Sequence, residues 1–144
     1  MRLMFRLPIL FGLTFAAPLH AQEAKDAILY KNPQCDCCEG YARALKDAGY
    51  TVKVVPTHDL PLIKREHNVP QALEGCHTTL IDGYVIEGHV PIAIVDRLLS
   101  DRPDIAGISL PGMPMGAPGM IGPKTETFVV YELTPSEPRV FATE

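Results

Sequence analysis

Three of the four cysteines fall within four consecutive residues, in the run CDCC at positions 35–38. The run follows a short apolar segment, residues 27–30, and precedes a stretch whose apolar residues recur every three or four positions. It therefore lies at a junction between a buried strand and a helix. The helix dipole and the free N–H groups of such a junction stabilise a thiolate. The CDCC run must therefore lie at the N-terminus of a helix.

The N-terminus has the pattern of a secretory signal peptide. Arg2 and Arg6 precede a largely apolar stretch, residues 7–19, and Ala21 is followed by polar residues. The stretch is shorter than the about twenty residues that a membrane span needs. We therefore expect residues 1–21 to be removed and the mature chain to be periplasmic, beginning near Gln22, without a membrane anchor. In that oxidising compartment cysteines usually form disulfides or bind metals.

The apolar periodicity predicts the element order β-α-β-α-β-β-α over residues 27–100. Asp82-Gly83 suits a two-residue hairpin loop with positive φ, and Gly49 and Pro91 mark a helix end and a helix start. The expected strands are residues 27–30, 52–55, 78–81 and 84–87, and helices are expected near 38–48, 60–67 and 91–100. This order predicts an α/β fold, a thioredoxin-like three-layer sandwich.

We expect that domain to span residues 22–104, and a C-terminal extension, 105–144, to contribute to a metal site. Residues 108–120 carry three prolines and three glycines, which predicts an extended loop that is neither helix nor central strand. Residues 127–133 and 140–141 predict a small β hairpin.

Charge argues against a nucleic-acid partner. The chain has 13 basic and 17 acidic residues, a net charge of −4, and no basic run that could follow a phosphate backbone. Loss of Arg2 and Arg6 with the signal peptide makes the mature chain more acidic.

The cysteine spacing permits redox chemistry. Cys35 and Cys38 form a C-x-x-C pair, in which Cys35 would attack and Cys38 would resolve. Cys38 shares a helix face with Tyr41 and should point inward, whereas Cys37 is rotated by about 100° toward the rim. One candidate function is therefore a thiol-disulfide oxidoreductase.

Structural explanations of the cysteines are weaker. Two structural disulfides, or a small binding module held together by them, would usually join distant segments, and three cysteines in one turn close at most one useful loop to Cys76. A mononuclear zinc site is disfavoured because adjacent Cys37 and Cys38 cannot easily both reach one tetrahedral ion. Crowded thiolates suit bridging between several soft ions, and thiolates and thioethers select Cu(I).

The methionines of the loop also favour a site for a soft metal. Met113, Met115 and Met120 are three of the five methionines in the chain and lie in the Pro- and Gly-rich segment, where no helical face needs them. Each could simply cover apolar surface. Together with four cysteines they make a constellation for a soft metal.

The histidines and Asp36 have different expected roles. His77, beside Cys76, is a candidate ligand or a proton-linked neighbour of one. We expect His89 to make a structural hydrogen bond at the start of the last helix. His58 and His67 are expected on the surface without a function, and Asp36 is expected to solvate its turn.

A resemblance to a known family rests on four segments taken together, residues 32–38, 75–79, 83–91 and 112–116. In these segments the chain resembles the CopG-type periplasmic copper-resistance proteins, a thioredoxin-like family recognised by its C-x-C-C motif. The resemblance covers about residues 27–120. It implies a domain whose cysteines, helped by the C-terminal extension, bind copper and exchange electrons with it. The ligands that it implies are Cys35, Cys37, Cys38 and Cys76, followed by Met113, Met115 and Met120.

The expected function is thus copper resistance in the periplasm, with Cu(I), as one ion or several, bound by the cysteine cluster and interconverted with Cu(II). The expected partners are copper ions and copper efflux or other periplasmic copper proteins, and we expect a monomer. The alternative remains a thiol-disulfide oxidoreductase using Cys35 and Cys38.

Overall fold

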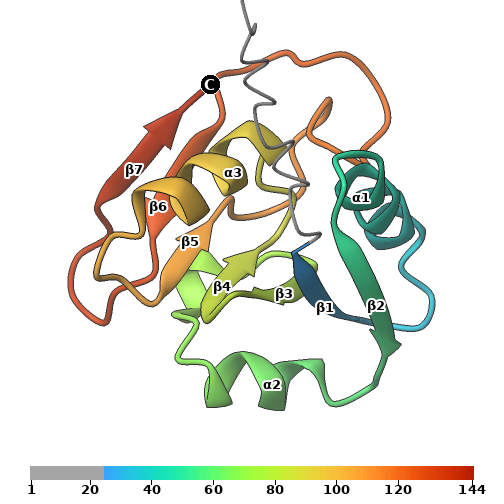
Figure 1. The fold of residues 1–144 in the computed structure, drawn as a ribbon, viewed down its shortest axis with the longest axis horizontal. Coiled ribbons are helices and arrows are strands. Elements are labelled where there is room, and N and C mark those ends of the chain that lie inside the picture. The colour runs from blue at the N-terminus through green and yellow to red at the C-terminus, as the bar shows by residue number, and fades with distance from the viewer. Residues whose placement is uncertain (1–24) are drawn as a thin grey trace, which may run out of the picture.

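A seven-stranded mixed sheet runs through the part of the chain that the computed structural model describes, residues 25–144 (Figure 1). The strand order is β2-β1-β3-β4-β5-β6-β7. The predicted signal peptide lies outside the described residues. The elements are β1 (Asp26–Lys31), α1 (Asp36–Asp47), β2 (Thr51–Pro56), α2 (Leu60–Glu66), the 3-10 turn η1 (Gln71–Leu73), β3 (His77–Ile81), β4 (Tyr84–Glu87), α3 (Ile92–Asp101), β5 (Gly107–Ser109), β6 (Val129–Glu132) and β7 (Val140–Thr143).

The first seven strands and helices follow the predicted order. β1 and β2, which α1 connects, pair in parallel, whereas β3 is antiparallel to both β1 and β4. Asp82 and Gly83 connect β3 to β4 with φ values of 50° and 86°. Two successive positive φ values match the right-handed twist of the flanking strands, so the hairpin predicted from Asp-Gly is confirmed.

Helices lie on both faces of the sheet, and alternate residues of each strand pack against one face or the other. Ile81 and Ile86 belong to the larger core cluster, which also contains the buried residues of α1 and α3. Their neighbours Leu80 and Val85 pack with Leu73 of η1 in a second, smaller cluster. α2 lies on that second face, since its Lys64 bonds to Thr78 of β3 (Figure 1).

The first helix, α1, directs Cys38 of the cysteine run into the larger core. Cys35 is its N-cap residue, and the helix ends before Gly49, whose φ is 96°. The buried stripe predicted by the spacing is confirmed at Cys38, Tyr41, Ala42 and Leu45. Across residues 25–144, no helix has both the length and the apolar character needed to cross a membrane.

The predicted loop over residues 108–120 is wrong at its start. Ile108 and Ser109 belong to β5, which is an interior strand that pairs with β4 and β6. The prolines begin only at Pro111, so the ladder is free to form before it. A Cβ on Gly107 would lie 1.9 Å from the carbonyl oxygen of Val85, so glycine permits the close pairing. The predicted β6–β7 hairpin is confirmed and extends the same sheet.

Gly40 of α1 makes a close backbone contact with the loop that follows β5. A Cβ at position 40 would lie 2.7 Å from the carbonyl oxygen of Gly119. Alanine normally favours a helix over glycine by about 1 kcal/mol, yet we expect Gly40→Ala to destabilise this protein by about 1–3 kcal/mol because the overlap displaces backbone. Urea unfolding measures this, with exposed Arg43→Ala as the control expected within about 0.5 kcal/mol of the parent. A stabilised Gly40→Ala variant would mean that the loop does not pack there.

Candidate metal centre

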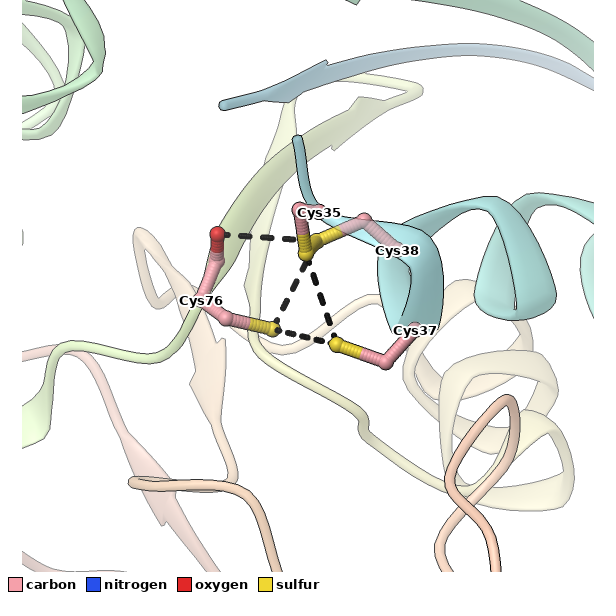
Figure 2. Close-up of side chains that lie close together, drawn as sticks. All are labelled: Cys35, Cys37, Cys38 and Cys76. Carbon is pink, nitrogen blue, oxygen red and sulfur yellow. Dashed lines mark hydrogen bonds between the residues drawn. A yellow bond between two sulfur atoms is a disulfide. The ribbon is translucent and has the colours of Figure 1, made fainter. Parts of the chain in front are cut away.

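The four cysteine sulfur atoms gather where α1 and β3 begin, and Figure 2 shows them converging from these two segments. Cys35 and Cys38 form a disulfide, and Cys37 and Cys76 are free. The Sγ atom of Cys76 lies 3.6 Å from that of Cys38 and 3.9 Å from that of Cys37. Cys37 Sγ lies 3.4 Å from Cys35 Sγ. Residues far apart in the sequence thus form one sulfur cluster.

The orientations predicted for the helix cysteines agree with the structure. Cys38 is fully buried in the larger core. Cys37 is only partly buried, and its sulfur faces both Cys35 and Cys76. Cys37 therefore lies at the rim of the cluster and still belongs to it.

His89 makes the structural hydrogen bond expected of it and, in addition, faces Cys76. Its Nε2 lies 2.9 Å from Cys76 Sγ, and its Nδ1 lies 2.7 Å from the carbonyl oxygen of Pro118. The carbonyl can only accept, so Nδ1 carries the proton, and in the neutral ring Nε2 has a lone pair directed at the sulfur. His89 thus belongs to the candidate site, and its hydrogen bond joins the residues before α3 to the loop after β5.

The predicted hairpin contained the signal for this residue. Ile81 pairs with Tyr84, and Thr78 pairs with Glu87. Continuing that register by two positions brings Cys76 opposite His89. The Asp-Gly turn fixes this register, so the pairing of Cys76 with His89 follows from the turn.

His77 is also close to Cys76, as its position beside the cysteine suggested. Its Nδ1 lies 3.3 Å from Cys76 Sγ, and its ring packs against Tyr41 with 4.6 Å between the ring centroids. The ring is fully buried, and its Nε2 has no hydrogen-bond partner among residues 25–144. His58 and Asp36, by contrast, are exposed and belong to neither potential metal-binding group of the described chain.

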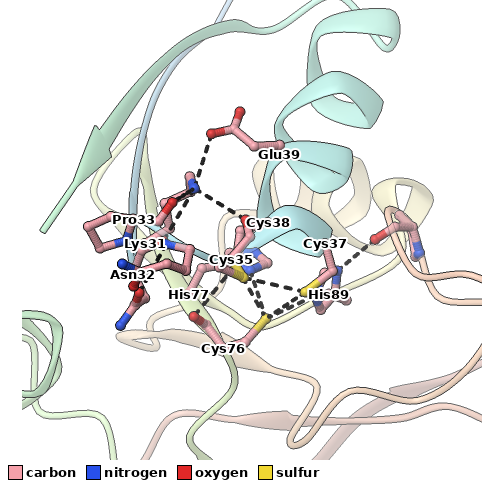
Figure 3. Close-up of a disulfide and its surroundings, with 12 residues drawn as sticks. Lys31, Asn32, Pro33, Cys35, Cys37, Cys38, Glu39, Cys76, His77 and His89 are labelled. Carbon is pink, nitrogen blue, oxygen red and sulfur yellow. Dashed lines mark hydrogen bonds and ion pairs between the residues drawn. A yellow bond between two sulfur atoms is a disulfide. The ribbon is translucent and has the colours of Figure 1, made fainter. Parts of the chain in front are cut away.

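A buried lysine that the sequence did not reveal holds the turn before the cysteines (Figure 3). Lys31 Nζ donates to the carbonyl oxygens of Asn32, Pro33 and Cys35 at 3.2–3.3 Å. It also forms an ion pair with Glu39 at 3.1 Å. The ammonium therefore links the end of β1 to the start of α1 and orders the backbone that carries Cys35.

A second buried network supports Cys76 from the opposite face of the sheet. The Glu87 carboxylate accepts hydrogen bonds from the Gly75 N–H and the Thr78 hydroxyl, both at 2.7 Å, and forms an ion pair with Lys64. Gly75 and Thr78 flank the Cys76–His77 pair. Glu87 therefore anchors the backbone on both sides of these two site residues.

The loop after β5 approaches the cluster, but its methionines differ in position. Met113 and Met115 are 57% and 50% exposed. Met120 is partly buried against the core cluster to which the cysteines also belong. A Cβ on Gly119 would lie 2.7 Å from the carbonyl oxygen of Cys37, so this part of the loop lies directly on the start of α1.

Burial sets the protonation of Cys76 and of the two histidines beside it. Burial, with a smaller contribution from neighbouring Cys37, raises the pKa of Cys76 to about 12. The same loss of solvent lowers the pKa of His77 and of His89, in His89 against the opposing hydrogen bond to Pro118. At neutral pH the site thus holds a protonated thiol and neutral imidazoles, and a metal that binds Cys76 must displace its proton.

We expect the stability of the metal-free protein to fall as the pH drops below about 6.5. A histidine whose pKa is lowered by folding binds its proton first in the unfolded chain, so acid favours unfolding. Thermal unfolding between about pH 8 and pH 5 tests this. His89→Gln should weaken the dependence, and exposed His58→Gln should leave it unchanged. A melting temperature that stays constant down to pH 5 would contradict the burial of neutral imidazoles.

The arrangement offers two overlapping donor groups. One contains the four cysteines, and the other contains Cys76, His77 and His89; within each group the donor atoms lie within 4.8 Å of one another. Thiolates select Cu(I), and imidazoles suit copper or zinc. The site thus has the chemistry for copper.

Comparisons with known proteins are consistent with this donor set. The family described as "Protein of unknown function, DUF411" matches residues 73–120. Two solved structures, titled "Copper resistance protein copG- Form 2" and "Copper resistance protein copG- Form 1", are each 33% identical to this chain with a TM-score of 0.78. The match covers 85% of this chain and 99% and 98% of those chains, respectively. No curated protein matches.

Proposed function

This chain belongs to the family of the copper resistance protein CopG, and from that premise we propose that it binds Cu(I) through Cys35, Cys37, Cys38 and Cys76. The observation that carries the proposal is the convergence of four sulfur atoms from two distant segments. The four cysteines act as ligands in their reduced form and bridge more than one ion. Thiolates at this density favour a soft monovalent ion over a tetrahedral zinc.

The proposed site extends beyond the cysteines. His77 and His89 add imidazole donors, and Met113, Met115 and Met120 supply thioethers from the C-terminal extension, residues 105–144. Support comes from the short distances between Cys76 and both histidines and from the contact between the loop and the start of α1. Met120 is the methionine best positioned for this role, since it is partly buried against the same core cluster as the cysteines.

We further propose that residues 22–104 form a thioredoxin-like domain and that the mature protein acts as a monomer in the periplasm. The order β2-β1-β3-β4, with helices on both faces, supports the fold assignment. The signal-peptide pattern of residues 1–21 supports export. The role is copper resistance, in which the protein interconverts Cu(I) and Cu(II) and exchanges copper with efflux or other periplasmic copper proteins.

Cys37→Ser tests the proposed site. The variant keeps the Cys35–Cys38 pair but removes the sulfur that lies between Cys35 and Cys76. We expect Cu(I) affinity, measured by competition with a chromophoric chelator, to fall sharply while Cys35 and Cys38 still oxidise to a disulfide. Copper binding equal to that of the parent would overturn the four-cysteine site.

The methionine loop gives a separate prediction. Met113→Leu combined with Met115→Leu keeps side-chain bulk and removes both thioethers. We expect Cu(I) affinity to fall several-fold, roughly 1 kcal/mol in binding free energy, without a change in melting temperature, because both side chains are half exposed. Unchanged affinity would mean that these two residues only cover apolar surface and do not bind copper.

A second candidate function is a thiol-disulfide oxidoreductase, favoured by the Cys35–Cys38 disulfide. In that case Cys35 attacks the substrate disulfide and Cys38 resolves the mixed disulfide. This function predicts turnover of a disulfide substrate without metal and no effect of the methionine substitutions.

A further inference from the structure

The disulfide divides the cluster into a bonded pair and a residual group. Closing the Cys35–Cys38 bond removes two of the four thiolate donors. The two free thiols stay beside it: Cys37 Sγ lies 3.4 Å from Cys35 Sγ, and Cys76 Sγ lies 3.6 Å from Cys38 Sγ. Both members of the bonded pair therefore contact a sulfur that can still bind a metal.

In the disulfide form, the residual group holds its donor atoms close together. Cys76, His77 and His89 hold their donor atoms within 4.8 Å of one another. His89 is fixed by the Pro118 carbonyl on one side and by the hairpin register on the other. The disulfide form thus retains sulfur and imidazole donors that do not depend on Cys35 or Cys38.

We propose that the Cys35–Cys38 pair stores the electrons of this site: as a dithiol it reduces two Cu(II) ions, and as a disulfide it leaves Cys37, Cys76, His77 and His89 to hold the Cu(I) formed. The inference rests on the proposed copper function and names the electron donor for it. The substrate is the Cu(II) ion, and an external reductant of the dithiol class would restore the pair.

The step balances. One sulfur–sulfur bond forms between Cys35 and Cys38, the two thiols lose two electrons and two protons, and each of two Cu(II) ions gains one electron. The protons pass to solvent. The structure favours this pair over Cys37 and Cys76, whose sulfur atoms remain 3.9 Å apart and unbonded.

The test uses the full reduced chain without oxygen, to which about two equivalents of Cu(II) chloride are added. Bicinchoninate measures Cu(I), thiol counting measures oxidation, and peptide mapping identifies the bond. We expect two Cu(I) per chain, two thiols lost and a Cys35–Cys38 disulfide. A Cys37–Cys76 bond, or disulfides between chains, would overturn the proposal.

Variants separate this chemistry from the nonspecific oxidation of thiols by copper. Cys38→Ser should oxidise its remaining thiols at least about tenfold more slowly, because it lacks the preformed partner. Asp36→Asn changes an exposed residue in the same turn and should match the parent. Parent-like rates in Cys38→Ser would overturn the proposal.

The two proposals can fail separately. If the reduced chain binds Cu(I) tightly but Cu(II) leaves all thiols intact, the electron store is wrong and the copper site stands. In the converse case, Cu(II) closes the Cys35–Cys38 bond and two Cu(I) are released, while the reduced chain binds no Cu(I). The proposed Cu(I) site is then wrong, and the proposal that the pair reduces Cu(II) stands.

Discussion

Cys76→Ser is expected to lower Cu(I) affinity by more than the roughly 10- to 100-fold that the loss of a group supporting a metal ligand costs. Cys76 is the cysteine that both donor groups share. Its sulfur faces Cys37 and Cys38 on one side and both histidines on the other. Serine has nearly the same size but offers a hard oxygen, which Cu(I) binds poorly. The substitution thus removes the central donor with little change in packing.

The measurement is a competition titration of reduced protein with Cu(I), accompanied by thermal unfolding of the metal-free form. Cys76 is only partly buried, so the melting temperature of metal-free Cys76→Ser should stay close to that of the parent. Parent-like copper affinity in a folded Cys76→Ser variant would show that the ligands lie elsewhere. A large loss of stability would show that Cys76 has a structural role instead.

Lys64→Met is expected to destabilise the fold by about 3–5 kcal/mol, because it leaves the Glu87 carboxylate buried without its counter-charge. The two side chains are 5% and 0% exposed, so solvent cannot replace the lost ammonium. Glu87 also accepts from Gly75 and Thr78, so its displacement would disturb the backbone on both sides of Cys76. Urea unfolding of the metal-free protein gives the stability.

The double variant Lys64→Met with Glu87→Gln is the matched control. It removes both charges, while the amide oxygen of the introduced glutamine can still accept a hydrogen bond from the Gly75 N–H. We expect it to recover most of the stability lost in Lys64→Met, since a neutral replacement of a buried pair is often tolerated. If Lys64→Met costs less than about 1 kcal/mol, the pair is solvated and does not anchor the site.

Much of the fold could be predicted from the sequence, because local signals fix it. Gly49 ends α1 in a positive-φ conformation, and Asp82-Gly83 sets the β3–β4 hairpin. The spacing from Cys38 to Leu45 defined the buried face of α1. β5 was missed because it has only three residues, and its place in the sheet depends on pairing with β4 and β6, which are both distant from it in sequence.

The site was predictable where its residues are adjacent in sequence and less so where pairing brings them together. The CDCC run identified three candidate ligands directly. His89 joins the site through the antiparallel register that also aligns Cys76. Lys31 looks like an ordinary strand-end lysine, and only the turn that folds three carbonyl oxygens toward it reveals its role.

The most direct test of the central claim is an anaerobic Cu(I) titration of the fully reduced protein, with free thiols counted before and after loading. Four cysteines that bind copper together predict more than one Cu(I) per chain and the loss of all four thiols from titration. A protein that binds no copper tightly, and whose Cys35–Cys38 disulfide simply re-forms in air, would contradict the copper site.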